Sequence, residues 1–147
     1  MAENIRFDTE DSYLITGFSD RLYSWNAALK ACPLGWHLAS DEEWNILIAH
    51  FGGPKAALAL KSSQGWDSHA WNESGNGTNK SGFSALPMGY RNDFGTFGSL
   101  GKGAFFWTST SVDSKIAKSR SIYHNETGVE GRESNKYSAY SCRCVLD

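Results

Sequence analysis

Apolar residues recur at helical spacing in the first half of the chain and at strand-like density in its last third. The clearest helical signal follows Ser40, where three acidic residues precede apolar positions three and four apart, namely Trp44, Leu47, Ile48 and Phe51. The Ser40 hydroxyl can accept from the backbone N–H of Glu43, and the Glu43 side chain can accept from the backbone N–H of Ser40. The stretch is therefore predicted to form a capping box. The pattern predicts a helix that begins after Ser40 and ends before Gly52.

Two shorter helices are predicted on either side of this one. Ser24 is a suitable N-cap, and the helix after it would place on one face Trp25, Ala28 and Leu29. The Cys32-Pro33 step ends that helix, because the residue before proline avoids helical dihedral angles. Pro54 can open a third helix that runs to Leu60.

Aromatic and β-branched residues become frequent towards the C-terminus, in runs short enough for strands. Predicted strands cover 104–110, 117–123, 127–132 and 138–146, with turns near Asn125 and Gly131, and shorter candidates lie at 13–16 and 21–23. Residues 65–103 are rich in glycine and asparagine and are predicted to form long, ordered loops. Helices first and strands last indicate an α+β domain with a mainly antiparallel C-terminal sheet.

Composition favours a single globular domain and excludes several classes of function. The chain has 147 residues and is 40% hydrophobic, which is enough to bury a core. A net charge of -2 gives no field to hold a polyanion, so no nucleic-acid partner is expected. No apolar run reaches the ~20 residues of a membrane span. Residues 1–6 lack a signal-peptide core, so the protein is either intracellular or its export signal lies outside this sequence.

The three cysteines, Cys32, Cys142 and Cys144, allow at most one intramolecular disulfide. Cys142 and Cys144 would point to the same face of a strand, which is poor geometry for a bond between them. A long-range bond from Cys32 to either one is favoured, and three reduced, buried thiols are the alternative. The four histidines show no metal-binding spacing, so no zinc site is expected.

Motifs for catalysis are missing from the sequence. The glycines at 95–103 lack the strand-to-helix context of a phosphate loop, and neither a Gly-x-Ser-x-Gly turn nor an EF-hand loop occurs. Helix capping explains the acidic residues at 41–43 better than catalysis does. The sequence therefore predicts no enzymatic activity and no cofactor.

The segment 118–138 has the composition of a binding surface. It combines tyrosine rings with short hydrogen-bonding side chains, the residue types that dominate adaptable binding loops. The alternative is an ordinary solvated strand face on which arginines pair with nearby glutamates. The candidate ligand-binding residues are Ser119, Ser121, Tyr123, His124, Asn125, Glu130, Arg132, Ser134, Asn135 and Tyr137.

Several stretches together resemble a known family, the Fibrobacter major paralogous (FISUMP) domain. They occur in the family's order and cover most of residues 20–147: Leu22-Tyr-Ser-Trp-Asn-Ala-Ala28, Ala31-Cys-Pro-Leu-Gly-Trp-His-Leu38, Ser40-Asp-Glu-Glu-Trp44, Gly77-Thr-Asn-Lys-Ser-Gly-Phe-Ser-Ala-Leu-Pro-Met-Gly-Tyr-Arg91, Phe106-Trp-Thr-Ser-Thr110 and Arg143-Cys144-Val145. The resemblance implies a C-type-lectin-like fold for one domain spanning 1–147. It also implies a disulfide between Cys32 and Cys144, with Cys142 left as a buried free thiol.

The resemblance further implies a secreted or cell-surface protein that binds or adheres, although a cytoplasmic location stays open. Some C-type-lectin-like domains carry a C-terminal region that diversity-generating retroelements mutate at adenines, and residues 118–138 lie where such a region would. We therefore expect a non-enzymatic domain that binds a protein or glycan and does not insert into membranes. A structural surface module without a soluble ligand is the first alternative. An enzyme similar to formylglycine-generating oxidases, using Cys142 or Cys144, is the second.

Overall fold

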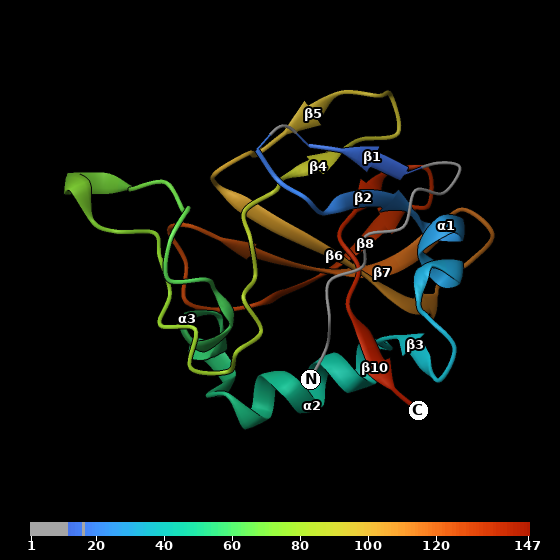
Figure 1. The fold of residues 1–147 in the computed structure, drawn as a ribbon, viewed down its shortest axis with the longest axis horizontal. Helices are drawn as coiled ribbons and strands as arrows, with labels where there is room; N and C mark the ends of the chain where they lie inside the picture. The colour runs from blue at the N-terminus through green and yellow to red at the C-terminus, as the bar shows by residue number, and fades with distance from the viewer. Residues whose placement is uncertain (1–11, 16) are drawn as a thin grey trace.

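The computed structural model describes residues 12–15 and 17–147, which form an α+β structure rich in strands (Figure 1). The helices are α1 (Trp25–Ala31), α2 (Asp41–His50) and α3 (Ala56–Leu60), with 3₁₀ turns η1 (Gly53–Lys55) and η2 (Ala70–Asn72). The strands are β1 (Ser12–Leu14), β2 (Arg21–Ser24), β3 (Trp36–Leu38), β4 (Tyr90–Arg91), β5 (Phe97–Gly98), β6 (Gly103–Ser111), β7 (Ile116–Tyr123), β8 (Glu130–Asn135), β9 (Ala139–Tyr140) and β10 (Cys144–Leu146).

Both predicted N-caps are confirmed. The Ser24 hydroxyl accepts from the backbone of Ala27 at the start of α1. At the start of α2, Ser40 Oγ accepts from the Glu43 N–H, and the Glu43 carboxylate accepts from the Ser40 N–H at 2.8 Å. These contacts satisfy backbone donors that have no partner within the helix, which fixes where each helix begins.

The apolar stripe of α2 is only partly covered. Trp44 is buried, whereas Leu47 and Phe51 pack at the edge of a core cluster and Ile48 is half-buried. In α1 the buried face comprises Trp25, Ala27, Ala28 and Ala31, so the expected position of Leu29 on that face was wrong.

The strands form three sheets within the described part of the chain. Their orders are β1-β2-β9-β4-β5, β10-β3 and β6-β7-β8, and every pair of named strands is antiparallel. Parallel bridges from Phe106 to Ser141 and from Ala104 to Gly89 join β6 to the neighbouring segments. The long β6–β7 hairpin is therefore the centre of the structure.

Three predicted strands differ from the observed ones. β8 covers 130–135 and not 127–132, so Gly131 lies inside a strand and the turn covers 124–129. The run at 138–146 is divided into β9 and β10 because residues 141–143 pass beside β6 between them. The N-terminal candidate at 13–16 corresponds to β1, and Thr16 lies outside the described residues.

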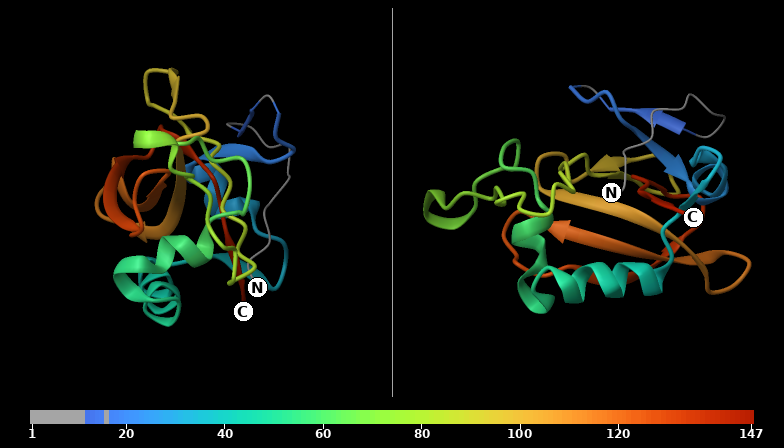
Figure 2. Two further views of the ribbon diagram at one scale, coloured as in Figure 1. Left: turned by 90° about the vertical axis from the view of Figure 1, so that its left-hand side faces the viewer. Right: turned by 60° about the horizontal axis from the view of Figure 1, so that its bottom comes forward.

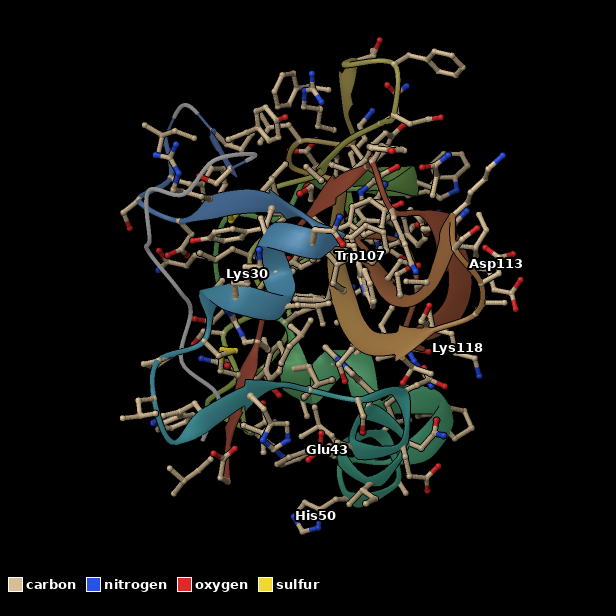
Figure 3. All side chains as sticks on the ribbon, turned by 90° about the vertical axis from the view of Figure 1, so that its right-hand side faces the viewer. Lys30, Glu43, His50, Trp107, Asp113 and Lys118 are labelled. Atoms are coloured by element: carbon tan, nitrogen blue, oxygen red, sulfur yellow. A yellow bond between two sulfur atoms is a disulfide. The ribbon has the colours of Figure 1, made fainter. Side chains whose placement is uncertain are left out.

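The central hairpin carries a core on each of its two faces. On one face Phe105 and Trp107 pack with α1 and Tyr140, and on the other Phe106 and Ile122 pack with α2 and α3. α1 and α2 accordingly lie on opposite sides of these strands (Figure 2). Figure 3 shows Trp107 inside the molecule beside α1. Its indole N–H donates to the carbonyl of Tyr23 at 2.8 Å, which satisfies a buried polar group.

A disulfide joins Cys32, at the end of α1, to Cys144 in β10, as the family resemblance implied. Cys142 is a buried free thiol. Over residues 12–15 and 17–147, the structure has no helix with the length and apolar character needed to cross a membrane.

Candidate functional site

The predicted ligand-binding residues divide into a buried group and an accessible group. Ser119, Ser121 and Ser134 are buried, at 1%, 0% and 8% exposure. The accessible or half-accessible members are Tyr123, His124, Asn125, Glu130, Arg132, Asn135 and Tyr137. Ser119 and Ser121 are buried because β7 is the middle strand of its sheet, and Ser134 of β8 is buried beside Ser119 and Tyr140.

Two of the buried serines, Ser119 and Ser134, link β7 to β8. Ser119 Oγ and Ser134 Oγ are 2.8 Å apart, and the Tyr140 hydroxyl lies 3.1 Å from Ser134 Oγ. Burial raises the pKa of Tyr140, so its hydroxyl keeps the proton that this hydrogen bond uses. These serines hold the strands in register below the surface and do not contact solvent.

Five of the accessible residues lie on β8 or beside it. We call the set Tyr123, Glu130, Arg132, Asn135 and Tyr137 the β8 surface. Among the described strands β8 has a neighbour on one side only. The Arg132 guanidinium donates to the Tyr123 hydroxyl, and the Tyr123 ring packs edge-on against Phe105 at 5.6 Å between centroids. The tyrosine ring is thus fixed between a cation and the core.

The far end of the β8 surface meets the turn between β4 and β5. Asn135 Nδ2 lies 3.4 Å from the Asp93 carboxylate, and Asn135 Oδ1 accepts from the backbone of Tyr137 at 2.9 Å. The Tyr137 side chain is 74% exposed, and Phe94 in the facing turn is 90% exposed. Sequence reasoning did not place Asp93 and Phe94 in this site, because they lie about forty positions away along the chain.

The turn 124–129 is anchored from below by a buried lysine. Lys61 is 1% exposed, and its ammonium donates to the carbonyl oxygen of Glu126 at 2.9 Å and to that of His124 at 3.5 Å. Burial lowers the pKa of Lys61 to about 8, and the nearby Glu126 carboxylate opposes this shift. The His124 ring lies edge-on to His69 at 5.9 Å and 3.2 Å from the carbonyl of Asp67. Asn125 stays exposed at the tip.

On the opposite face of β7, ion pairs join the sheet to the start of α2. Arg120 donates to the Asp41 carboxylate at 2.7 and 2.9 Å and to Asn45 Oδ1 at 2.8 Å. Lys118 Nζ lies 3.4 Å from the same carboxylate. Figure 3 shows Lys118 on the outer side of the sheet, away from Trp107. Asp41, in the first turn of α2, therefore also holds β7.

A histidine connects α2 to the end of β10. His37 Nδ1 lies 2.7 Å from Asp147 Oδ1, and His37 Nε2 lies 2.8 Å from Glu43 Oε1. The hydrogen bond to Asp147, and then that to Glu43, raise the pKa of His37. An apolar groove of about 610 Å³ lies between these elements; it is lined mainly by α2 and β10 and includes Trp44, Ile46, Leu47, Phe51, Phe83 and Val145.

The structure offers little for metal or thiol chemistry in the region it describes. Residues 12–15 and 17–147 contain no group of three or more histidine, cysteine, aspartate or glutamate side chains placed to hold a metal ion. Cys144 is in the disulfide, and burial raises the pKa of the Cys142 thiol far above its usual range. A thiolate nucleophile at either position would need a different environment.

Comparison with known families agrees with the geometry. The family model described as the Fibrobacter succinogenes major domain matches residues 2–146. The chain belongs to this family. No curated protein and no solved structure matches the chain.

Proposed function

We propose that this major domain is a non-enzymatic binding domain whose β8 surface recognises a protein or glycan at the cell exterior. The observation that carries the proposal is the display of Tyr137, Arg132 and Asn135 around an edge strand. That strand is paired along its length with β7, which contributes Ala117 to one core cluster and Ile122 to the other. Exposed aromatic, guanidinium and amide groups on a rigid support bind with little loss of conformational entropy.

The β8 strand is suited to substitution. Residues 130–133 are all exposed, and Ser134 is the buried member of the strand. Changes at exposed positions away from caps and networks alter stability by only about 0.5 kcal/mol. This tolerance supports the further proposal that residues 118–138 belong to a region diversified by a retroelement. Within that region, the buried positions of β7 would have to stay constant.

Four features support a C-type-lectin-like scaffold. The terminal strand β10 pairs with β3, the disulfide joins α1 to β10, two helices cover the sheet, and a long loop region precedes β6. In Figure 1 the segment between α3 and β4 extends to one side of the sheets, although Phe83 and Ala85 from it are buried in the core. This proposal concerns the scaffold and not a particular ligand.

A structural assembly module is the second candidate, and the apolar groove favours it. Ile46 and Leu146 at this groove are 63% and 62% exposed, which is unusual for large aliphatic side chains unless another surface covers them. A formylglycine-type enzyme has less support, because the thiol it would use is either bonded or buried.

The proposal is tested by probing the purified domain on glycan and protein arrays and then titrating any bound molecule. We expect Tyr137→Ala and Arg132→Ala each to weaken binding by about tenfold or more, as central aromatic and arginine contacts do. Lys30→Ala, which removes an exposed cation from the last turn of α1 and is not part of the β8 surface, is the control and should bind normally. Unchanged affinity in both β8 variants would place the binding site elsewhere.

The diversification proposal has its own test in the gene. A near-repeat of the codons for 115–145 beside a reverse-transcriptase gene, differing at adenines, would support it and would mark the ligand-facing positions. If the differing codons fell on the buried Ser119 and Ser121 rather than on exposed positions, this assignment of the binding face would be wrong.

A further inference from the structure

Trp71 is an exposed aromatic residue in a strained backbone. Its side chain is 95% exposed, and both Trp71 and Asn72 have a φ of +60°. Bulky residues rarely adopt this left-handed conformation, which costs about 1–3 kcal/mol per residue and persists only where the surroundings impose it. An indole held open to solvent at such a cost makes no contact that stabilises the fold.

The surroundings of Trp71 do impose this conformation. We call residues 69–73 the Trp71 hairpin, which projects beyond α3 in Figure 1. It is closed by hydrogen bonds from His69 N to Glu73 O at 2.9 Å and from Glu73 N to Ala70 O at 3.3 Å. At its base, the Asp67 N–H donates to the carbonyl of Gly101 at 2.8 Å.

A second anchor lies below the hairpin. Trp66 is buried, and its indole N–H donates to Ser62 Oγ at 3.0 Å and to the carbonyl of Ala85 at 3.2 Å. The segment that follows the hairpin packs closely against Asp67, because a Cβ at Gly75 would lie 2.2 Å from the Asp67 carbonyl oxygen. The exposed ring is therefore presented by a rigid base and not by a loose loop.

The groups beside the ring are polar. Asn72 is exposed, and the Glu73 carboxylate is 70% exposed and 3.7 Å from His69 Nδ1. A central contact for a protein partner is normally a cluster of apolar side chains that excludes water. An isolated indole beside an amide, a carboxylate and an imidazole suits a ligand with one apolar face and many hydroxyls at its edge.

We propose that the Trp71 hairpin is a carbohydrate contact site. It would take a pyranose ring with equatorial hydroxyls, whose C–H face is flat enough to stack on the indole while Asn72 and Glu73 bind hydroxyl groups. The site does not rest on the function proposed for the β8 surface and uses none of its residues. Loss of binding at one surface would leave the other unaffected.

The test uses the whole domain and soluble β-linked oligosaccharides of glucose, xylose and N-acetylglucosamine. We expect at least one of these sugars to shift the indole N–H signal of Trp71 in a nitrogen-proton NMR spectrum. We expect Trp71→Ala to weaken that binding by about tenfold or more and Trp71→Phe, which keeps a ring, to weaken it less. Phe94→Ala removes a similarly exposed ring from the turn between β4 and β5 and should leave the affinity unchanged.

Two results would overturn the proposal. One is that none of the sugars moves the Trp71 signal at millimolar concentration while the other signals show a folded protein. The other is self-association in sedimentation experiments that Trp71→Ala abolishes, since the indole would then be a contact between protein chains. Because Trp71 makes no core contact, the Ala variant should fold normally, and its retained spectrum checks this.

Discussion

Replacing Lys61 by methionine tests whether an ammonium group is buried beneath the turn 124–129. The Lys61 side chain is almost completely buried, and its polar partners are the carbonyl oxygens of His124 and Glu126. Methionine keeps most of the volume and removes the charge. The difference in free energy of unfolding between wild type and Lys61→Met should depend on pH, because the pKa of the lysine differs between the folded and the unfolded chain.

The magnitude follows from that difference. The pKa of Lys61 is about 8 in the folded chain and 10.5 in an unperturbed lysine. Below pH 8 the amine is charged in both states, and above pH 10.5 it is neutral in both. Between these values the unfolded chain binds more protons, so the free energy of unfolding rises with pH. At ~1.4 kcal/mol per pH unit, wild type should gain about 2 kcal/mol between about pH 7.5 and pH 10.

Urea titrations followed by tryptophan fluorescence measure this gain. The quantity to compare is the difference in free energy of unfolding between wild type and Lys61→Met at each pH. Tyrosines titrate equally in both proteins and cancel in the difference. Lys55→Met removes an exposed charge from the neighbouring η1 turn and is the control for loss of a lysine. If the Lys61 difference does not change with pH, the Lys61 amine titrates as it does in water and does not anchor the turn.

The disulfide, the His37 contacts and the buried thiol should also have measurable effects. The double substitution Cys32→Ala and Cys144→Ala opens a loop closed over 112 positions and should lower the free energy of unfolding in urea by about 4–5 kcal/mol. A loss under about 1 kcal/mol would contradict the loop-closure argument. The pKa of His37 is raised in the folded chain, so His37 should stabilise the fold relative to His37→Gln fully below about pH 6.5. This stabilisation should disappear as the pH rises through the pKa of His37 in the folded chain. If the two proteins differ in free energy of unfolding by the same amount at every pH, the ion pairs of His37 are refuted. The Cys142 thiol should react with a thiol reagent only after unfolding, and rapid reaction in native buffer would contradict its burial.

Local signals were sufficient to predict the parts of the fold that depend on neighbouring residues. The hydroxyls of Ser24 and Ser40 fix both helix starts, and each acts within three positions of itself. Local signals could not predict the pairing of Cys32 with Cys144, because the residues alone allowed either Cys142 or Cys144 as its partner. The family resemblance selected the pair that the structure contains.

The candidate site was harder to predict because it depends on strand order. Composition identified 118–138 as polar but could not show that β7 would be the middle strand, which buries Ser119 and Ser121. The same limitation hid Asp93, which lies near the β8 surface only because the β4–β5 turn approaches Asn135. A strained residue such as Trp71 has no sequence signal, since its backbone is imposed by contacts that are distant in the chain.

The buried serines explain how a polar strand can belong to the core while the neighbouring strand β8 displays an exposed surface. A hydrophobic β7 would pack equally well, but Ser119 and Ser134 also hold β8 through a hydrogen bond under the sheet. The attachment of β8 therefore depends little on its exposed side chains. Substitutions at Glu130 or Arg132 can then change the surface without moving the strand, whereas Ser134→Val would leave Ser119 without its partner and should loosen β8. A binding face open to substitution requires this separation between the residues that hold a strand and those that it displays.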